Sequence, residues 1–401
     1  MPTPLRAANA ASVLRAVLLH GPVPRTRIAE LSSLSPATVT RLYPLLADRG
    51  LLRELDGPEA GQTLGRPRVP VDLDASGWAA LGVHLGVRRS VFGLLDLRGR
   101  LLGAGELEHD EDASPDAVID QACERLRALY ARAAGRRRLL GLGVISGGRA
   151  GAEADRPASA PEPGRRATDL SAEFARGIGL PGLPVFVDEH VRAMATAECL
   201  FGRARKASSL GYLYVGDVLG FAYSSDGAVH RGSHAAAGDI AHLPLGLTPP
   251  ADLAADIVPC ECGSRDCFLA LAGERGVAER AVRLGVVPEP RIDLVLKAAR
   301  AGDELAERLL RDRARNVGAA VAVLLGVLDP ELFVVAGRGL TEAAEYLPDL
   351  RAAVRERLRA AGGPPVTIVP TAFGAQVGAV AAASVVIDRV VRDPLAVRVP
   401  R

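Results

Sequence analysis

The sequence predicts an α/β protein in which a winged helix-turn-helix precedes a larger, two-lobed region. Helical periodicity fills the first 50 residues, and two short strand patterns follow it. From Trp78 onward, apolar strands alternate with amphipathic helices, and this order of elements occurs twice. We therefore place the first domain at residues 1–74 and the second at residues 75–401.

The composition is that of a globular protein. The chain has 401 residues, 48% of them hydrophobic, which suffices for two or three domains with their own cores. No apolar run reaches the roughly 18 residues of a membrane span, and no signal-peptide pattern opens the chain. Five cysteines, three of them clustered, are typical of a reducing compartment. We expect a cytoplasmic protein with no membrane partner.

Three helices are predicted in the first domain. The first ends at Gly21-Pro22, and a short second helix spans residues 25–31. After a polar turn, the third begins at Ser35-Pro36, because serine is a favoured N-cap and proline a favoured first helical residue. Two helices joined by a short turn form a helix-turn-helix, although any small three-helix bundle shows the same periodicity.

The exposed start of the third helix offers small polar side chains and one arginine, which suit base edges and phosphates. Residues 51–55 and 68–73 are predicted strands of a wing, and Arg66 near its tip could enter a minor groove. Residues 1–70 carry nine arginines against five acidic residues, which permits DNA binding. Pro44 should kink or shorten the third helix beyond its base-reading start. The candidate DNA-contacting residues are Arg25, Ser35, Ala37, Thr38, Thr40, Arg41 and Arg66.

A cysteine cluster gives the strongest chemical signal in the chain. Cys260, Cys262 and Cys267 fall within eight residues, and His242 lies upstream. Thiolate sulfur and imidazole nitrogen suit Zn²⁺, and four such ligands close a tetrahedral structural site. The alternative is a chance cluster of buried thiols, with His242 as an ordinary core residue.

The second domain is predicted as two successive strand-hairpin-then-helix units. Their repetition indicates a duplicated fold with a cleft between lobes, which is the default place for a ligand. The predicted strands are residues 80–87, 90–96, 101–109, 140–145, 184–187, 210–215, 219–224, 332–336 and 366–369, and the predicted helices are residues 115–134, 268–284, 291–300 and 303–328, one helix through 197–198 and one after Gly374. Residues 147–168 are predicted to form a long loop.

The sequence resembles the ROK family (repressors, open reading frames and kinases) over nearly the whole chain. Gly238-Asp239-Ile240-Ala241-His242 resembles the family motif G-E-I-G-H, and the segment from Cys260 to Cys267 resembles C-x-C-G-x-x-x-C. The resemblance implies an actin-like, ribonuclease-H-like ATPase fold and a structural zinc bound by His242, Cys260, Cys262 and Cys267. Family members with a winged helix are regulators, usually repressors that release a two-fold-symmetric operator when a sugar binds, and they are dimers or larger.

The sequence departs from the family's kinases at the phosphate-binding segments. The motif D-x-G-G-T is His84-Leu85-Gly86-Val87-Arg88 here, and G-T-G-x-G is Gly216-Asp217-Val218-Leu219-Gly220. Phosphoryl transfer relies on positioning and charge neutralisation. We therefore expect no kinase activity and assign no catalytic residue.

The family's sugar ligands are altered as well. By resemblance, the effector-binding candidates are Glu189, His190, Asp239 and His242, whereas Leu269 replaces a ligating glutamate. A polar network that loses a member discriminates less well between ligands. The effector is thus a sugar, another small molecule, or absent, and Glu189 and His190 are alternatively a drifted pair in an unused cleft.

The sequence therefore favours a DNA-binding transcriptional regulator. Its expected partners are a palindromic operator and further copies of the chain, as a homodimer or homotetramer. Two alternatives stay open at this point. One is a sugar kinase that uses ATP and keeps a vestigial winged helix. The other is a regulator controlled by a protein partner instead of a metabolite.

Overall fold

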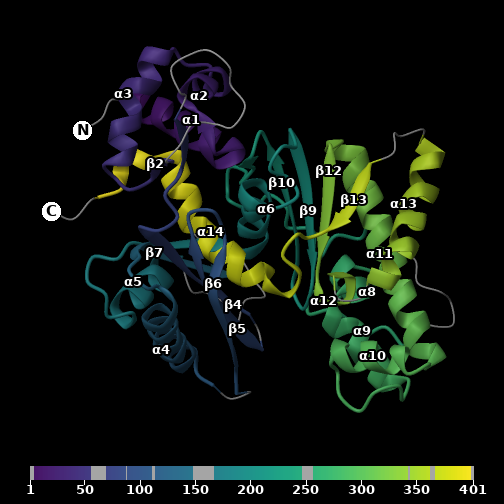
Figure 1. Cartoon of the computed structure of the whole chain (residues 1–401). Helices are drawn as coiled ribbons and strands as arrows, with labels where there is room; N and C mark the ends of the chain where they lie inside the picture. The colour runs from purple at the N-terminus through teal and green to yellow at the C-terminus, as the bar shows by residue number, and fades with distance from the viewer. Residues whose placement is uncertain are drawn as a thin grey trace. The chain divides into compact units, whose positions relative to one another are not determined.

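The computed structural model describes residues 4–55, 69–86, 88–110, 113–147, 167–245, 256–341, 344–361 and 366–398 (Figure 1). The chain divides into two compact units. The first contains residues 1–201 and 378–401, and the second contains residues 202–377. The winged helix therefore belongs to the same unit as the first lobe, and the C-terminal segment returns to that unit.

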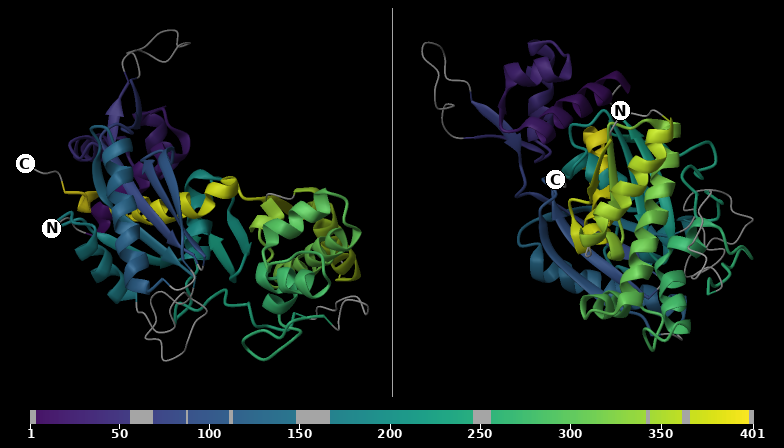
Figure 2. Two further views of the ribbon diagram at one scale, coloured as in Figure 1. Left: turned by 90° about the horizontal axis from the view of Figure 1, so that it is seen from below. Right: turned by 90° about the vertical axis from the view of Figure 1, so that its right-hand side faces the viewer.

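The N-terminal elements form three helices and a small sheet (Figure 2, purple). The helices are α1 (Pro4–His20), α2 (Arg25–Ser32) and α3 (Pro36–Ala47), and the strands are β1 (Val23–Pro24), β2 (Leu52–Glu54) and β3 (Pro70–Leu73). Strand β3 pairs antiparallel with both β1 and β2. The predicted helices and the base of the predicted wing are confirmed, whereas Arg66 lies outside the described residues.

The first unit also holds a five-stranded sheet with the order β6-β5-β4-β7-β8. Its strands are β4 (Trp78–Leu85), β5 (Arg89–Asp96), β6 (Leu101–Glu108), β7 (Arg138–Ser146) and β8 (Val185–Glu189). The first three strands pair antiparallel, and β7 and β8 extend the sheet in parallel from β4. The carboxyl ends of β4, β7 and β8 therefore share one edge, which is where ligands bind in open α/β sheets.

Helices cover this sheet. They are α4 (Pro115–Ala133), α5 (Ala167–Gly177), α6 (His190–Phe201) and α14 (Val377–Arg392), and a 3₁₀ turn, η3 (Pro394–Ala396), follows α14. Glycine lets α14 approach closely, because a Cβ on Gly82 of β4 or Gly143 of β7 would collide with the backbone of α14. The segment from Gly374 to Arg392 is long and apolar enough to cross a membrane, but 67% of it is buried, as expected of a core helix.

The second unit repeats the arrangement with the sheet order β11-β10-β9-β12-β13. Its strands are β9 (Ser209–Val215), β10 (Leu219–Ser225), β11 (Ala228–Val229), β12 (Leu332–Ala336) and β13 (Thr367–Pro370). An antiparallel meander again comes first, and two parallel strands extend it from β9. The predicted duplicated α/β fold is thereby confirmed.

Helices α8 (Phe268–Ala272), α9 (Glu274–Arg283), α10 (Ile292–Arg300), α11 (Glu304–Leu328), α12 (Arg338–Thr341) and α13 (Leu347–Ala361) complete the second unit with the 3₁₀ turns η1 (Ala344–Tyr346) and η2 (Gly374–Gln376). The long α11 is buried along most of its length and packs against α13. The helix predicted over residues 268–284 is two helices, because the backbone is extended at Gly273. Helices α5, α12 and α13 were not predicted.

Candidate functional site

The recognition helix α3 begins as its sequence predicts. Ser35 caps the helix, and its side chain accepts a hydrogen bond from the Thr38 amide at 3.2 Å. The Ser35 and Thr38 hydroxyls also lie 2.9 Å apart. This geometry fixes the first turn, so the polar side chains that follow it have a defined direction.

The outer surface of α3 is open to solvent. Ala37, Thr40 and Arg41 are exposed, and Thr38 is half-buried. Among the residues that the structure describes, Arg41 makes no hydrogen bond or ion pair, so its guanidinium remains available to a ligand. Pro44 is exposed and does not end the helix, which continues to Ala47.

Arg25 contacts side chains of two other elements of the winged helix. Its guanidinium lies 2.8 Å from the Glu54 carboxylate of β2 and 3.9 Å from the centre of the Tyr43 ring. Burial raises the pKa of Tyr43, and the nearby Glu54 charge raises it further. Arg25 therefore links α2, α3 and β2.

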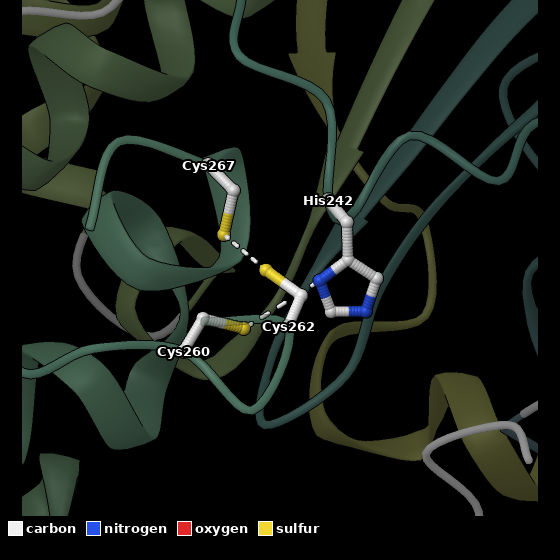
Figure 3. Close-up of side chains that lie close together, drawn as sticks. All are labelled: His242, Cys260, Cys262 and Cys267. Atoms are coloured by element: carbon white, nitrogen blue, oxygen red, sulfur yellow. Dashed lines mark hydrogen bonds between the residues drawn. The ribbon is translucent and has the colours of Figure 1, made fainter. Parts of the chain in front are cut away.

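The four candidate metal ligands converge in the second unit (Figure 3). One ligand atom from each of His242, Cys260, Cys262 and Cys267 lies within 4.8 Å of every other. The Cys262 and Cys267 sulfurs are 3.8 Å apart, and the Cys260 sulfur is 3.5 Å from Nδ1 of His242. A tetrahedral Zn²⁺ with bonds of about 2.3 Å to sulfur and 2.0 Å to nitrogen requires about 3.8 Å and 3.5 Å for these edges. The cluster can therefore hold a metal ion of this type.

Backbone hydrogen bonds bring the two ligand-bearing segments together. The amides of Phe268 and Leu269 donate to the carbonyls of Leu243 and Ala241, at 3.1 and 2.8 Å. Gly263 adopts a φ of +85°, which lets the chain turn between Cys262 and Cys267. The predicted proximity of His242 to the cysteines thus follows from pairing of the chain on either side of the cluster.

The thiols of the cluster differ in their environment. Burial raises the pKa of Cys267 to about 12, whereas the Ser264 amide lowers the pKa of the exposed Cys262. A metal ion binds the thiolate form and removes these protons. The chemistry of the donor set therefore suits a cation with an affinity for sulfur.

A second polar group, the histidine cluster of His84, His190 and Glu189, lies in the first unit. Nε2 of His84 is 3.2 Å from Nδ1 of His190, and Nε2 of His190 is 3.3 Å from Oε1 of Glu189. A neutral imidazole has one donor and one acceptor nitrogen, so a chain from His84 through His190 to the carboxylate satisfies both nitrogens of His190. Burial lowers the pKa of His84 to about 4 and places that of His190 well below its usual range.

Glu189 is also tied to the helix that follows it. Its two carboxylate oxygens accept the Val191 and Arg192 amides, each at 2.9 Å. Burial raises the pKa of Glu189 to about 7, against the lowering effect of Arg192. Both oxygens are engaged within the unit, so Glu189 fixes the start of α6 and the His190 ring. The sequence identified Glu189 and His190 as effector-binding candidates but did not predict their contact with His84. By resemblance, His84 replaces the Asp of D-x-G-G-T and His190 replaces the Asp of the family's N-D pair, so a contact between the two positions could have been expected.

The remaining effector candidates lie in the second unit. Asp239 and His242 are exposed, and the Nδ1 atom of His242 faces the cysteine cluster. Leu269 packs against the apolar core. The structure thus places Glu189 and His190 together in one unit and Asp239 and His242 together in the other.

The sequence profile of the ROK family matches residues 80–389. The chain is 36% identical over 394 residues to Transcriptional regulator Rv0485 of Mycobacterium tuberculosis, covering 96% of this chain and 86% of that protein. It is 26% identical over 357 residues to the DNA-binding transcriptional dual regulator NagC of Escherichia coli, covering 84% of this chain and 82% of that protein.

Solved structures show the same fold. The crystal structure of a ROK family transcriptional regulator, a homologue of the E. coli Mlc protein, has a TM-score of 0.76 at 23% identity and covers 98% of both chains. A ROK hexokinase from Thermus thermophilus has a TM-score of 0.60 at 26% identity and covers 78% of this chain and 99% of that chain. The likeness to the regulator therefore extends over the winged helix, whereas the kinase covers a smaller share of this chain.

Proposed function

The chain belongs to the ROK family, and we propose that it is a DNA-binding transcriptional regulator, acting as a repressor in the cytoplasm. The observation that carries the proposal is the winged helix, with a capped recognition helix and an exposed Arg41 that pairs with none of the described residues. Its relatives over nearly the full chain are named transcriptional regulators. We propose a homodimer or homotetramer on a palindromic operator.

DNA reading follows from the exposed face of α3. Arg41 would form a bidentate contact with guanine or hold a phosphate, and Thr40 and Ala37 would contact base edges or thymine methyl groups. Ser35 and Thr38 fix the first turn through their own hydrogen bond. Arg25 would act mainly by holding β2 against α2 and α3. Arg66 is proposed as a contact from the wing on the sequence alone.

We infer that the His242 and cysteine cluster binds Zn²⁺ as a structural ion. The spacing of the ligand atoms fits a tetrahedral site, and four protein ligands leave no open position for a substrate. Zinc would fix the loop that precedes α8. Because His242 faces the cluster through Nδ1, its part in effector binding would use its other nitrogen.

We propose a small-molecule effector, a sugar or a related compound, for the residues Glu189, His190, Asp239 and His242. Glu189 is engaged by α6 and His190, so its role would be to orient the histidine. We propose no catalytic activity, because His84 and His190 stand where the family's kinases carry acidic residues. Ligand binding would change the operator affinity only through different affinities for two states of the protein.

Electrophoretic mobility shifts with DNA from around the coding region, competitor DNA and a salt series test the regulator function. We expect a discrete complex that survives competitor, and a loss of about 1–3 kcal/mol of binding free energy for Arg41→Ala. Arg132→Ala removes an exposed arginine of α4 and serves as the matched control. Salt-sensitive smearing without a preferred fragment, including after selection from a random pool, contradicts the proposal.

A further inference from the structure

Arg49 lies at a junction within the first unit, directly after the recognition helix. Its Nη1 atom donates to the Leu45 carbonyl of α3 at 2.8 Å, and its Nε atom donates to the Leu395 carbonyl of η3 at 3.4 Å. Its own carbonyl accepts the Trp78 indole N–H at 2.7 Å. A single residue thus joins the recognition helix α3, the strand β4 and the C-terminal turn η3.

The contact with Trp78 is closely fitted. Trp78 is only 5% exposed, and the Arg138 guanidinium lies over its ring at 5.1 Å. The neighbouring Gly50 has a φ of +66°, and a Cβ at this position would lie 3.2 Å from the indole nitrogen. A side chain at residue 50 would therefore be strained and would press on the indole, so this position favours glycine.

Strand β4, which bonds Arg49, and helix α14, which η3 follows, also meet at the histidine cluster. Strand β4 begins at Trp78 and carries His84 near its other end. Helix α14 starts beside His84, because a Cβ on Gly378 would lie 2.7 Å from Nδ1 of that histidine. The turn η3, which follows the C-terminal end of α14, contacts α1 and α3. Both elements therefore run between the histidine cluster and the base of the recognition helix.

We propose that Arg49 is a positioning residue that couples the recognition helix to the histidine cluster. A displacement of β4 or α14 at His84 reorients α3, because a packed strand and helix move as rigid elements. Arg49 is bonded to Trp78 at the start of β4 and to Leu395 in η3, the turn that follows α14. The inference rests on the proposed function, since it assigns the route by which the first lobe controls DNA reading. Coupling of this kind changes affinities by a few-fold to about thirtyfold.

A double-mutant cycle tests the coupling. DNA recovered by the wild-type protein from a random pool is titrated with Arg49→Gln, His84→Gln and the double variant. We expect Arg49→Gln to weaken DNA binding about tenfold. The affinity change of the double variant should differ by about threefold or more from the product of the changes caused by Arg49→Gln and His84→Gln, as it does for residues in one network. The proposal is overturned if the affinity change of the double variant lies within about threefold of that product, or if His84→Gln has no effect on DNA affinity. Trp78→Phe keeps the packing, removes the N–H donor and should reproduce Arg49→Gln, while Arg132→Gln should match the wild type.

Fluorescence provides a test that needs no DNA. Trp78 is the only tryptophan of the chain, so its emission and its quenching by acrylamide report on this junction alone. His84→Gln should shift this emission in both the wild-type and the Arg49→Gln background, because β4 carries both His84 and Trp78. Amide hydrogen exchange in α3 should respond to His84→Gln in the wild-type background and lose that response in the Arg49→Gln background, because the bond from the Arg49 side chain to the Leu45 carbonyl is then absent. An equal response of α3 in both backgrounds, or no shift of the emission, overturns the coupling. If the protein binds no DNA while this dependence on Arg49 is present, the proposed function fails and the coupling stands.

Discussion

The half-buried His84 is in contact with the buried His190, and desolvation keeps both rings neutral at neutral pH. The pKa of His84 falls to about 4, and that of His190 also lies far below its usual range. In the unfolded chain both would titrate near pH 6.5. The folded state therefore binds fewer protons than the unfolded state below this pH, and acid weakens the fold.

We predict that the free energy of unfolding falls as the pH drops from about 6.5 to 4, and that His84→Gln makes this fall shallower. His84 contributes at most about 3 kcal/mol to the change, because one pKa unit corresponds to about 1.4 kcal/mol. Urea unfolding at a series of pH values measures it. His234→Gln, which removes an exposed histidine of the second unit, is the control.

Glu189 acts with the opposite sign, because its folded pKa is raised to about 7. Its contribution to stability is present below about pH 4.5 and is lost as the pH rises through 7. Glu189→Gln should therefore steepen the acid-induced loss of stability. An unchanged slope in both His84→Gln and Glu189→Gln would contradict the assigned protonation states.

Arg25 shows what residue type alone can and cannot predict. An arginine at the start of a helix in a basic domain is a reasonable DNA-contact candidate, and the sequence contains no sign of its partners. Glu54 and Tyr43 lie on other elements, and only the folded chain brings them to the guanidinium. By contrast, the Ser35 cap was predictable because capping depends on residues within one turn.

At the scale of elements, the loop before α8 is exposed over much of residues 259–266. Cys262 and His242 are exposed, and Cys267 caps α8 with its sulfur, 3.4 Å from the Ala270 amide. A loop of this kind depends on its ligands to stay ordered. A metal that binds only the folded form adds its binding free energy to stability, which is about 4 kcal/mol at a free concentration of 1,000 times Kd.

We predict that removing the metal with a chelator lowers the melting temperature and increases amide hydrogen exchange in residues 256–272. Cys262→Ala should lose metal, as measured by mass spectrometry, and should show the same exchange pattern. Cys199→Ala, which removes a thiol outside the cluster, should retain the metal. Full metal content in Cys262→Ala would refute the ligand assignment.

Elements defined by local signals were predicted well, and elements defined by packing were not. Strands β4, β5 and β7 are mostly apolar, so their positions follow from the sequence. The break between α8 and α9 was missed because periodicity continues across Gly273, where a Cβ would lie 2.6 Å from the Leu269 carbonyl oxygen. Helix α13 was missed because it is rich in arginine and is defined by its contact with α11.

At the scale of the whole molecule, the duplication gives each unit a sheet edge with a polar cluster. In the second unit an ion pair between Arg313 and Glu274 lies at this edge. The Arg313 guanidinium donates to the carbonyls of Val215 and Ala272, at 2.9 and 2.8 Å, and lies 3.7 Å from the Glu274 carboxylate. The Glu274 carboxylate accepts the Arg338 amide at 2.8 Å. Backbone groups at the ends of β9 and β12 are thus bonded within the protein.

Charged groups at this edge of the second unit explain why substitutions at His84 and His190 in the first unit should not restore kinase activity. Burial raises the pKa of Glu274, and the Asp217 charge raises it further, so the two carboxylates lie close enough to interact. Asp217 belongs to the segment that resembles the second phosphate-binding loop. Negative charge at that position opposes a nucleotide phosphate, and phosphoryl transfer requires charge neutralisation there.

We predict that His84→Asp combined with His190→Asp yields no ATP turnover above background with glucose, N-acetylglucosamine or mannose. The double variant restores acids at both altered positions of the first unit but leaves Asp217, Glu274 and Arg313 in place. A coupled assay of ADP release measures turnover, with a ROK glucokinase assayed in parallel to establish its sensitivity. Sugar-dependent turnover in the double variant would show that the second unit still binds nucleotide, and the ion pair of Arg313 and Glu274 would then have to open or leave the phosphate site free.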